Sequence, residues 1–176
     1  MAHRTPEYLD DPTAAVPLSN GGVACIDAED APRVLLHRWR QDCNGYARRS
    51  TPAGSREGRR LWSCILLHRF IVDAPAGVIV DHKDGHPLNC RRSNLRYATP
   101  GESSRNGGMR RNNTSGYKGV SWHRQAGKWN AYITVDWKRR SLGVFDTKEG
   151  AARAYNDAAT QLHGAFARPN EIEGAS

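Results

Sequence analysis

The sequence predicts an α+β protein of two small units, the second of which is a three-stranded antiparallel sheet packed on one helix. Three observations support this prediction. The chain has 176 residues, 38% of them hydrophobic, which suits two modest cores. Apolar and polar residues alternate within residues 117–145, as in strands with one buried face. Alanines and larger apolar residues then recur at helical spacing between residues 146 and 164.

The amino terminus is expected to be an extension over residues 1–19. Residues 1–20 hold acidic residues, three prolines and no apolar run, so we read no targeting segment there. No later stretch is long enough to cross a bilayer. We therefore expect a cytoplasmic protein with no membrane partner.

The next elements follow from local patterns. A short strand precedes a helix that opens on acidic residues, two strands pair across a polar, glycine-rich loop, and a third apolar strand comes after Gly77. In order, these elements are expected at residues 22–26, 27–39, 45–49 paired with 61–66, and 78–80.

The third strand runs directly into a pair of titratable residues, Asp81 and His82, and Asn94 follows His82 by twelve residues. Hydrolysis of a phosphodiester needs a deprotonated water and a positive charge near the leaving oxygen. A neutral imidazole and a divalent cation can divide these tasks. Two titratable groups at the end of a strand are unusual, and they mark this position as a candidate site.

The segments LLHRFI, VIVDHKDGHPLNCRRSNLRYAT and SSRN closely resemble the HNH endonuclease family. The resemblance implies a small ββα-metal (HNH) nuclease domain over residues 20–106, in which two antiparallel strands and a helix hold a metal ion. It implies that His82 is the general base, that Asp81 is a metal ligand and that Asn94 orients His82. Asn is also common at helix caps, which is the alternative role for Asn94.

The last position of that motif departs from the family. Family members end a Thr-x-x-x-Asn pattern with an Asn that binds metal, and this chain has Ser103 there, with Asn106 one turn later. A hydroxyl is a weaker donor for a hard cation than an amide carbonyl. We expect Mg²⁺, with Mn²⁺ as the alternative, held by Asp81 and by Ser103 or Asn106. The departure keeps open an impaired enzyme that acts as a site-specific DNA-binding regulator.

Residues 107–114 are polar, glycine-rich and basic, and predict a flexible linker. Strands are then expected at 117–123, 129–136 and 140–145, followed by the helix that ends at Gly164. The stretch over 115–170 resembles the Apetala-two / ethylene-response-factor DNA-binding domain, and 171–176 is a tail.

That resemblance implies a sheet laid into the major groove of double-stranded DNA. The expected groove-facing residues are Lys118, Ser121, His123, Arg124, Tyr132, Thr134, Arg139 and Ser141. Three further basic residues, Lys128, Lys138 and Arg140, are expected to meet phosphates.

Charge agrees with a nucleic-acid partner, because the chain carries a net charge of +8 with a pI near 9.7. Residues 105–140 hold nine basic residues against one acid. A solvated face or a ribosome-associated, RNA-binding surface is the alternative reading of this charge. The four cysteines form no CxxC pair, so we expect no structural zinc, and we expect no small-molecule cofactor.

Together these features predict a sequence-directed DNA endonuclease of the homing type. One such site cuts one strand. A monomer is therefore expected to nick DNA, whereas a dimer can break both strands.

Overall fold

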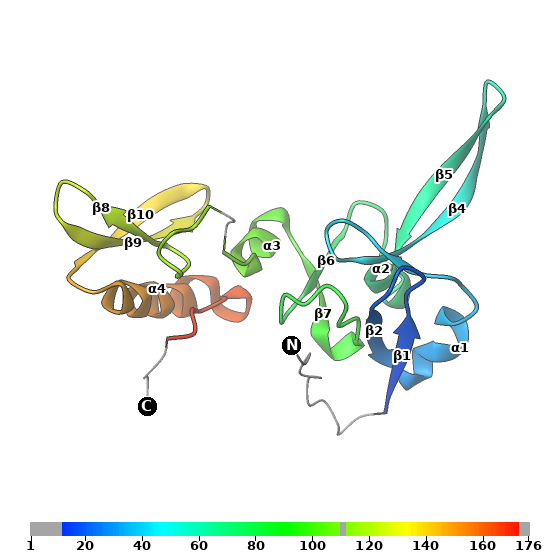
Figure 1. The fold of residues 1–176 in the computed structure, drawn as a ribbon, viewed down its shortest axis with the longest axis horizontal. Coiled ribbons are helices and arrows are strands. Elements are labelled where there is room, and N and C mark those ends of the chain that lie inside the picture. Colours follow the sequence, from blue (N-terminus) through cyan, green and yellow to red (C-terminus); the bar gives the residue numbers. More distant parts are fainter. Residues whose placement is uncertain (1–11, 110–111, 173–176) are drawn as a thin grey trace. The chain divides into compact units, whose positions relative to one another are not determined.

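A computed structural model describes residues 12–109 and 112–172, and the chain divides into two compact units between Tyr97 and Ala98 (Figure 1). Parts of the expected extension, linker and tail lie outside the described residues, namely 1–11, 110–111 and 173–176. Small antiparallel sheets and a few helices make up both units, so the predicted α+β class is confirmed.

The first unit opens with a hairpin of two antiparallel strands, β1 (Thr13–Pro17) and β2 (Val23–Asp27). β1 lies within the segment expected to be an extension. The alternation that identifies it is short, but it buries Val16 to 1% exposure in the core. That core also contains Ile26, Leu67 and Ile71.

The predicted helix over residues 27–39 is too long. The structure has a 3-10 turn, η1 (Ala28–Asp30), and a one-turn helix, α1 (Ala31–Val34). Beyond it the chain turns so that Trp39 enters the core, where its indole N–H donates to the Val34 carbonyl at 2.9 Å. Leu36 is left 79% exposed. Burial of Trp39 thus ends the helix earlier than the sequence pattern predicts.

The glycine-rich loop expected between two strands is mostly strand. After β3 (Arg40–Gln41), the strands β4 (Ala47–Arg56) and β5 (Arg59–Leu66) pair antiparallel up to a two-residue turn. Figure 1 shows this hairpin projecting from the rest of the first unit. α2 (Leu67–Ile71) follows and packs at its base.

The last elements of the motif region are β6 (Ile79–His82), a 3-10 turn η2 (Arg92–Asn94) and β7 (Leu95–Ala98), with β6 and β7 hydrogen-bonded to each other. α3 (Pro100–Asn106) then opens the second unit. Its start is fixed by a capping box, in which Thr99 and Glu102 bond to each other's backbone N–H.

The second unit contains the predicted sheet and helix. The strands β8 (Val120–His123), β9 (Lys128–Val135) and β10 (Lys138–Phe145) form an antiparallel sheet in the order β10-β9-β8. α4 (Lys148–His163) is capped by Thr147 and covers one sheet face, and η3 (Gly164–Phe166) follows.

Alternation along β9 explains this packing, because Ala131 and Ile133 are buried while Thr134 is exposed. Small residues bring helix and sheet together. Gly119 has φ +75°, and a Cβ there would lie 2.1 Å from the Tyr155 ring. Only glycine fits at this point of contact.

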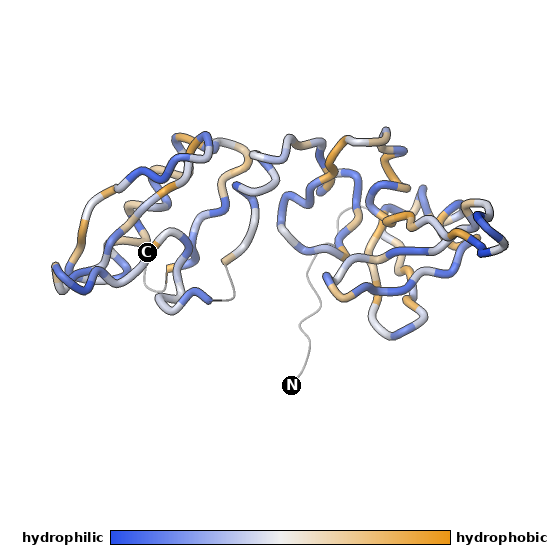
Figure 2. The backbone as a smooth tube through the Cα atoms, turned by 90° about the horizontal axis from the view of Figure 1, so that it is seen from above, coloured by the Kyte–Doolittle hydropathy of each residue, from blue (hydrophilic) through white to orange (hydrophobic). Residues whose placement is uncertain are grey.

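Figure 2 shows hydrophobic stretches broken by hydrophilic ones along the backbone. Among the described helices, none combines the length and apolar character needed to span a membrane.

Candidate active site and nucleic-acid interface

Asp81 and His82 are the last two residues of β6, and their side chains have different partners. The Asp81 carboxylate accepts hydrogen bonds from Arg96 of β7, through Nε at 3.0 Å and Nη2 at 2.9 Å. Both side chains are largely buried, since Asp81 is 11% exposed and Arg96 is 13% exposed. The carboxylate is therefore engaged by a close cation.

His82 lies on the other side of β6 and is 4% exposed. Burial is the main cause of a lowered pKa for its imidazole, and the nearby carboxylates of Asp84 and Asp81 partly oppose it. The ring is thus neutral at pH 7. Neutral imidazole is the form that can accept a proton from water.

Three side chains pack against His82 that sequence reasoning did not assign to the site. The His68 ring lies 4.8 Å from it, centroid to centroid, and the Tyr46 ring 5.9 Å. The Cys90 sulfur is 3.8 Å from Nε2. Burial raises the pKa of the Cys90 thiol to about 12, so it is protonated. Cys90 sits inside the motif segment, and only that position could have pointed to it.

Asn94 fastens the loop that follows β6. Its amide nitrogen donates to Asp84 Oδ1 at 2.9 Å and to the Asn89 carbonyl at 2.8 Å, and its oxygen accepts from the Asp84 N–H at 3.1 Å. The loop is closed further by the Asn89 amide, which donates to Asp84 Oδ2 at 2.7 Å. These bonds fix the turn next to His82. A direct role of Asn94 on the His82 ring stays a prediction.

The two other predicted metal ligands, Ser103 and Asn106, lie on α3 in the second unit. Ser103 is partly exposed, whereas Asn106 is 3% exposed. Within the described residues, three or more His, Cys, Asp or Glu side chains nowhere gather as a metal cluster. The carboxylate of Asp81 is a hard oxygen donor of the kind that Mg²⁺ or Mn²⁺ prefers, and its role as a metal ligand stays a prediction.

In the β10-β9-β8 sheet of the second unit, the strand register shows which side chains share the polar face. Arg139 pairs with Thr134, and Ser141 with Tyr132, so all four point away from α4. Ser121 and His123 of β8 pair with Asn130 and Lys128 on the same face. Arg124 lies in the exposed turn after β8. Two predicted phosphate contacts, Lys138 and Arg140, pair with Val135 and Ile133, so they lie on the other face of the sheet.

Several of these side chains already have partners. The Arg139 guanidinium carbon lies 3.4 Å from the centroid of the Tyr132 ring. Lys128 is 3.0 Å from Asp146 Oδ1, and His123 Nδ1 accepts from the Ala126 N–H at 3.1 Å. The contact of Arg139 with Tyr132 orders a cation on the polar face.

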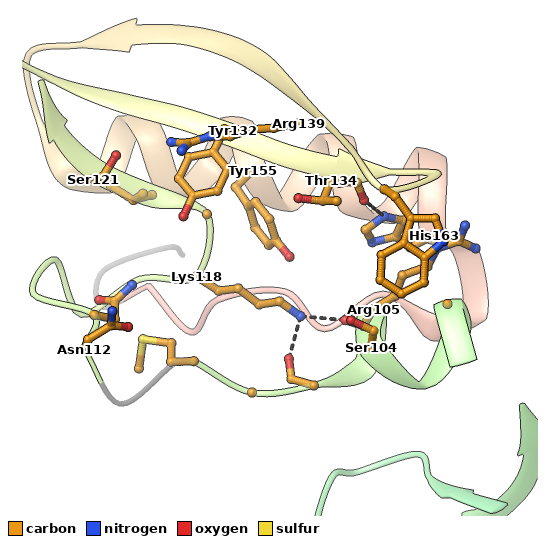
Figure 3. Close-up of a pocket in the computed structure, with 18 of the residues that line it drawn as sticks. Ser104, Arg105, Asn112, Lys118, Ser121, Tyr132, Thr134, Arg139, Tyr155 and His163 are labelled. Atoms are coloured by element: carbon orange, nitrogen blue, oxygen red, sulfur yellow. Dashed lines mark hydrogen bonds between the residues drawn. The ribbon is translucent and has the colours of Figure 1, made fainter. Parts of the chain in front are cut away.

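Lys118 differs from the other predicted DNA contacts. Its ammonium donates to the carbonyl oxygens of Arg105 at 2.5 Å and Gly107 at 2.6 Å, at the end of α3 (Figure 3). Burial lowers the pKa of Lys118 to about 8. These contacts border an open pocket of about 780 Å³ that Tyr132, Thr134 and Arg139 also line.

Comparisons with known proteins match both halves of the chain. A family model described as HNH endonuclease matches residues 73–105. Protein 3.8 of Escherichia phage T7 is 40% identical over 94 residues, 53% of this chain and 77% of that protein. An uncharacterized HNH endonuclease of Acanthamoeba polyphaga mimivirus is 31% identical over 159 residues, 87% of this chain and 77% of that protein.

Plant transcription factors match a shorter region. The AP2-like ethylene-responsive transcription factor TOE2 of Arabidopsis thaliana is 41% identical over 64 residues, which is 36% of this chain and 13% of that protein. Ethylene-responsive transcription factor ERN1 of Medicago truncatula is 45% identical over 67 residues, 37% of this chain and 25% of that protein. The chain therefore combines likenesses to two kinds of protein.

Proposed function

This chain belongs to the HNH endonuclease family, and we propose that it is a homing-type DNA endonuclease that hydrolyses one strand at a time with a divalent metal ion. The observation that carries this proposal is the pair at the end of β6. There burial lowers the pKa of His82 and keeps its imidazole neutral, and the carboxylate of the adjacent Asp81 is bound by Arg96.

His82 is proposed to accept the proton of the attacking water. Its lowered pKa keeps the base unprotonated at neutral pH, which general-base catalysis requires. Asn94 contributes by closing the loop after β6 through Asp84 and Asn89, so that the turn beside His82 keeps one conformation. Packing against His68 further restricts the His82 ring.

Asp81 is proposed to hold the divalent ion through a carboxylate oxygen. When bound, such an ion stabilises the negative charge that builds on the phosphoryl group and on the leaving oxygen. Arg96 competes for this carboxylate, because it donates two hydrogen bonds to Oδ2. The second oxygen donor, for which the sequence offers Ser103 or Asn106, stays a prediction.

The second unit is proposed to bind duplex DNA with the polar face of its sheet. Support comes from the AP2/ERF relatives and from the register, which gathers Arg139, Tyr132 and Thr134 on one face. A β-sheet face of this kind suits the major groove, where every base pair shows a distinct pattern of donors and acceptors. Cleavage would thereby be directed to chosen sequences.

A second candidate is a DNA-binding regulator with an impaired nuclease site. Ser103 at the position of a metal-binding Asn favours it, and so does the ion pair that engages Asp81. This candidate predicts sequence-specific binding without cleavage.

Cleavage of supercoiled plasmid and of DNA from the source genome separates the two candidates. The full chain is incubated with Mg²⁺ or Mn²⁺, or with EDTA. We expect nicking that needs the metal, is lost in His82→Ala, and persists in the control variant His86→Ala, whose imidazole is exposed in the same turn. Specific binding with no cutting under either metal would leave only the regulator.

A further inference from the structure

We propose that the β4–β5 hairpin of the first unit is a second DNA-binding element, which lies in the major groove of duplex DNA. This inference rests on the proposed function and adds a contact surface to it. It assigns a role to residues 49–64, which neither the motif nor the sheet of the second unit explains.

Most of the hairpin is not packed against a hydrophobic core. Nearly every residue from Ser50 to Cys64 is exposed, on both faces of the two strands. Only the base of β4 is covered by a third strand, because β3 pairs with it at Ala47 and Arg48 alone. Beyond that point the hairpin is a free two-stranded ribbon, as Figure 1 shows.

A free ribbon gains little from its own folding, since isolated hairpins are marginally stable in water. Here a two-residue turn at Glu57 and Gly58, with φ values of 52° and 75°, closes the ribbon and sets its twist. The free part of the ribbon runs over residues 49–56 and 59–65, which makes it roughly 23 Å long. Such a defined, extended element without a core points to a partner.

The charge of the ribbon identifies the class of partner. Residues 47–64 hold five arginines against one acid, Glu57. The arginines are Arg48, Arg49, Arg56, Arg59 and Arg60. Arginine forks fit phosphate oxygens and the O6/N7 edge of guanine, and a run of them attracts a phosphate polymer.

Alternation along β5 distributes these groups over both faces. Arg60 and Trp62 point to one face, and Arg59 and Leu61 to the other. Trp62 is 59% exposed and Leu61 44% exposed. Each face therefore offers a cation beside an apolar side chain, which suits a groove with phosphate walls and a floor of bases and thymine methyl groups.

At the base, Arg49 fixes the direction in which the ribbon leaves the core. Its guanidinium carbon lies 5.4 Å from the Phe70 ring centroid and 5.7 Å from that of Trp39. Phe70 belongs to α2 and packs against the same core as Trp39. The ribbon is thus anchored on the unit that carries His82.

The width of the ribbon selects the groove. Two strands lie about 4.8 Å apart before side chains are added. The major groove of B-DNA is about 12 Å wide and admits a two-stranded ribbon, whereas the minor groove is about 6 Å wide. The deep, narrow major groove of A-form RNA excludes it.

The test measures the binding of a mixed-sequence 40-base-pair DNA duplex between 50 and 300 mM salt, in full-length His82→Ala protein so that no cleavage occurs. Arg59→Ser/Arg60→Ser is compared with the control Arg38→Ser/Arg153→Ser, which removes two exposed charges outside the hairpin. We expect the hairpin variant to bind about tenfold more weakly and to lower the slope of log affinity against log salt by about 2. We expect a smaller change in the control.

The inference is overturned if the hairpin variant binds DNA as the parent does, or if both variants lose the same amount. A double-stranded RNA of the same sequence is the second probe. The inference is also overturned if the hairpin variant loses as much affinity for this RNA as for DNA, or more. The ribbon would then act on the phosphates of any duplex. If the parent protein binds no duplex at all, the proposed function itself fails, which is a different result. Because both arginines are exposed, unchanged circular dichroism is expected for all variants.

Discussion

The imidazole rings of His68 and His82 lie 4.8 Å apart, at 72° to each other, in the interior of the first unit. Among the described residues, the Nδ1 atom of His68 is one of the few buried side-chain atoms that lack a hydrogen-bond partner. Burial, followed by the neighbouring His82, lowers the pKa of His68 to about 3. Neither ring can therefore take up a proton without a cost in stability.

Acid should destabilise the first unit through this pair. The folded-state pKa of His68 lies below its unfolded value of 6.5, so below pH 6.5 the unfolded chain binds a proton that the folded chain does not. The free energy of unfolding therefore falls by about 2 kcal/mol at pH 5 because of His68, at about 1.36 kcal/mol per pKa unit. Denaturant unfolding between pH 5 and 7.5 measures it.

His68→Phe is the variant that tests this account, because phenylalanine keeps a ring beside His82 and cannot be protonated. We expect it to lose less stability on acidification than the parent. His86→Asn, which removes an exposed imidazole, should keep the full acid dependence. An acid dependence unchanged by His68→Phe would show that other groups cause it.

The ion pair between Asp81 and Arg96 gives a second prediction. Arg96→Gln leaves a carboxylate of 11% exposure without its cation. We expect a loss of about 3 kcal/mol in EDTA, typical of breaking a buried pair from one side. Added Mg²⁺ should restore part of this loss, because a cation bound at Asp81 replaces the guanidinium charge.

Thermal unfolding with and without Mg²⁺ measures the restoration. The control is Asp81→Asn/Arg96→Gln, which removes both charges and should show no gain from the metal. A gain of the same size in the double variant would place the Mg²⁺ effect elsewhere in the chain.

Sequence reasoning succeeded where one pattern spans a whole element. The alternation in β9 and the helical spacing in α4 predicted the sheet of the second unit and the helix packed on it. Ala131 and Ile133 are buried on one face of the sheet, and α4 is the following amphipathic helix that packs against them. The Asp81–His82 pair was located at a strand end for the same reason. In these places local pattern and tertiary packing agree.

It was less successful where tertiary contacts override local pattern. Residues 51–58 contain Pro52 and Gly54 and have the composition of a loop, yet strand pairing continues through a bulge between Pro52 and Ser55. The contacts of Lys118 with α3 depend on a fold that brings a loop to a helix end, so spacing in the sequence could not reveal them. The same holds for Tyr46 beside His82.

Asn94 offers a third prediction, on the loop after β6. Asn94→Ala removes three hydrogen bonds and leaves the Asp84 N–H and the Asn89 carbonyl without this partner. We expect a loss of about 2 kcal/mol in stability and faster amide exchange over residues 83–90. Cleavage should fall more than DNA affinity does, because His82 adjoins this loop.

Asn94→Asp separates shape from hydrogen bonding. It keeps the acceptor for the Asp84 N–H but presents a carboxylate to Asp84 Oδ1 and to the Asn89 carbonyl. We expect Asn94→Asp to be no more stable and no more active in cleavage than Asn94→Ala. If Asn94→Asp retained full stability and activity, the two donated bonds would not be what holds the loop.

The last prediction concerns Lys118, whose ammonium is bound at the end of α3. The folded-state pKa of about 8 lies below the usual 10.5, so between pH 8 and 10.5 the unfolded chain binds a proton that the folded chain has released. Stability should therefore rise with pH through this window, by about 1 kcal/mol at pH 9. Lys118→Met should abolish the rise, whereas Lys138→Met, at an exposed position of β10, should keep it.

The same variant tests whether Lys118 positions α3. Lys118→Met leaves the Arg105 and Gly107 carbonyls without a donor they have in the parent, so we expect faster amide exchange in α3 and no change in α4. If Lys118 only touched DNA, exchange in the free protein would be unaltered and the salt slope of DNA binding would fall by about 1. Faster exchange in α3 with an unchanged salt slope would instead make Lys118 a positioning residue that holds α3 against the sheet of the second unit.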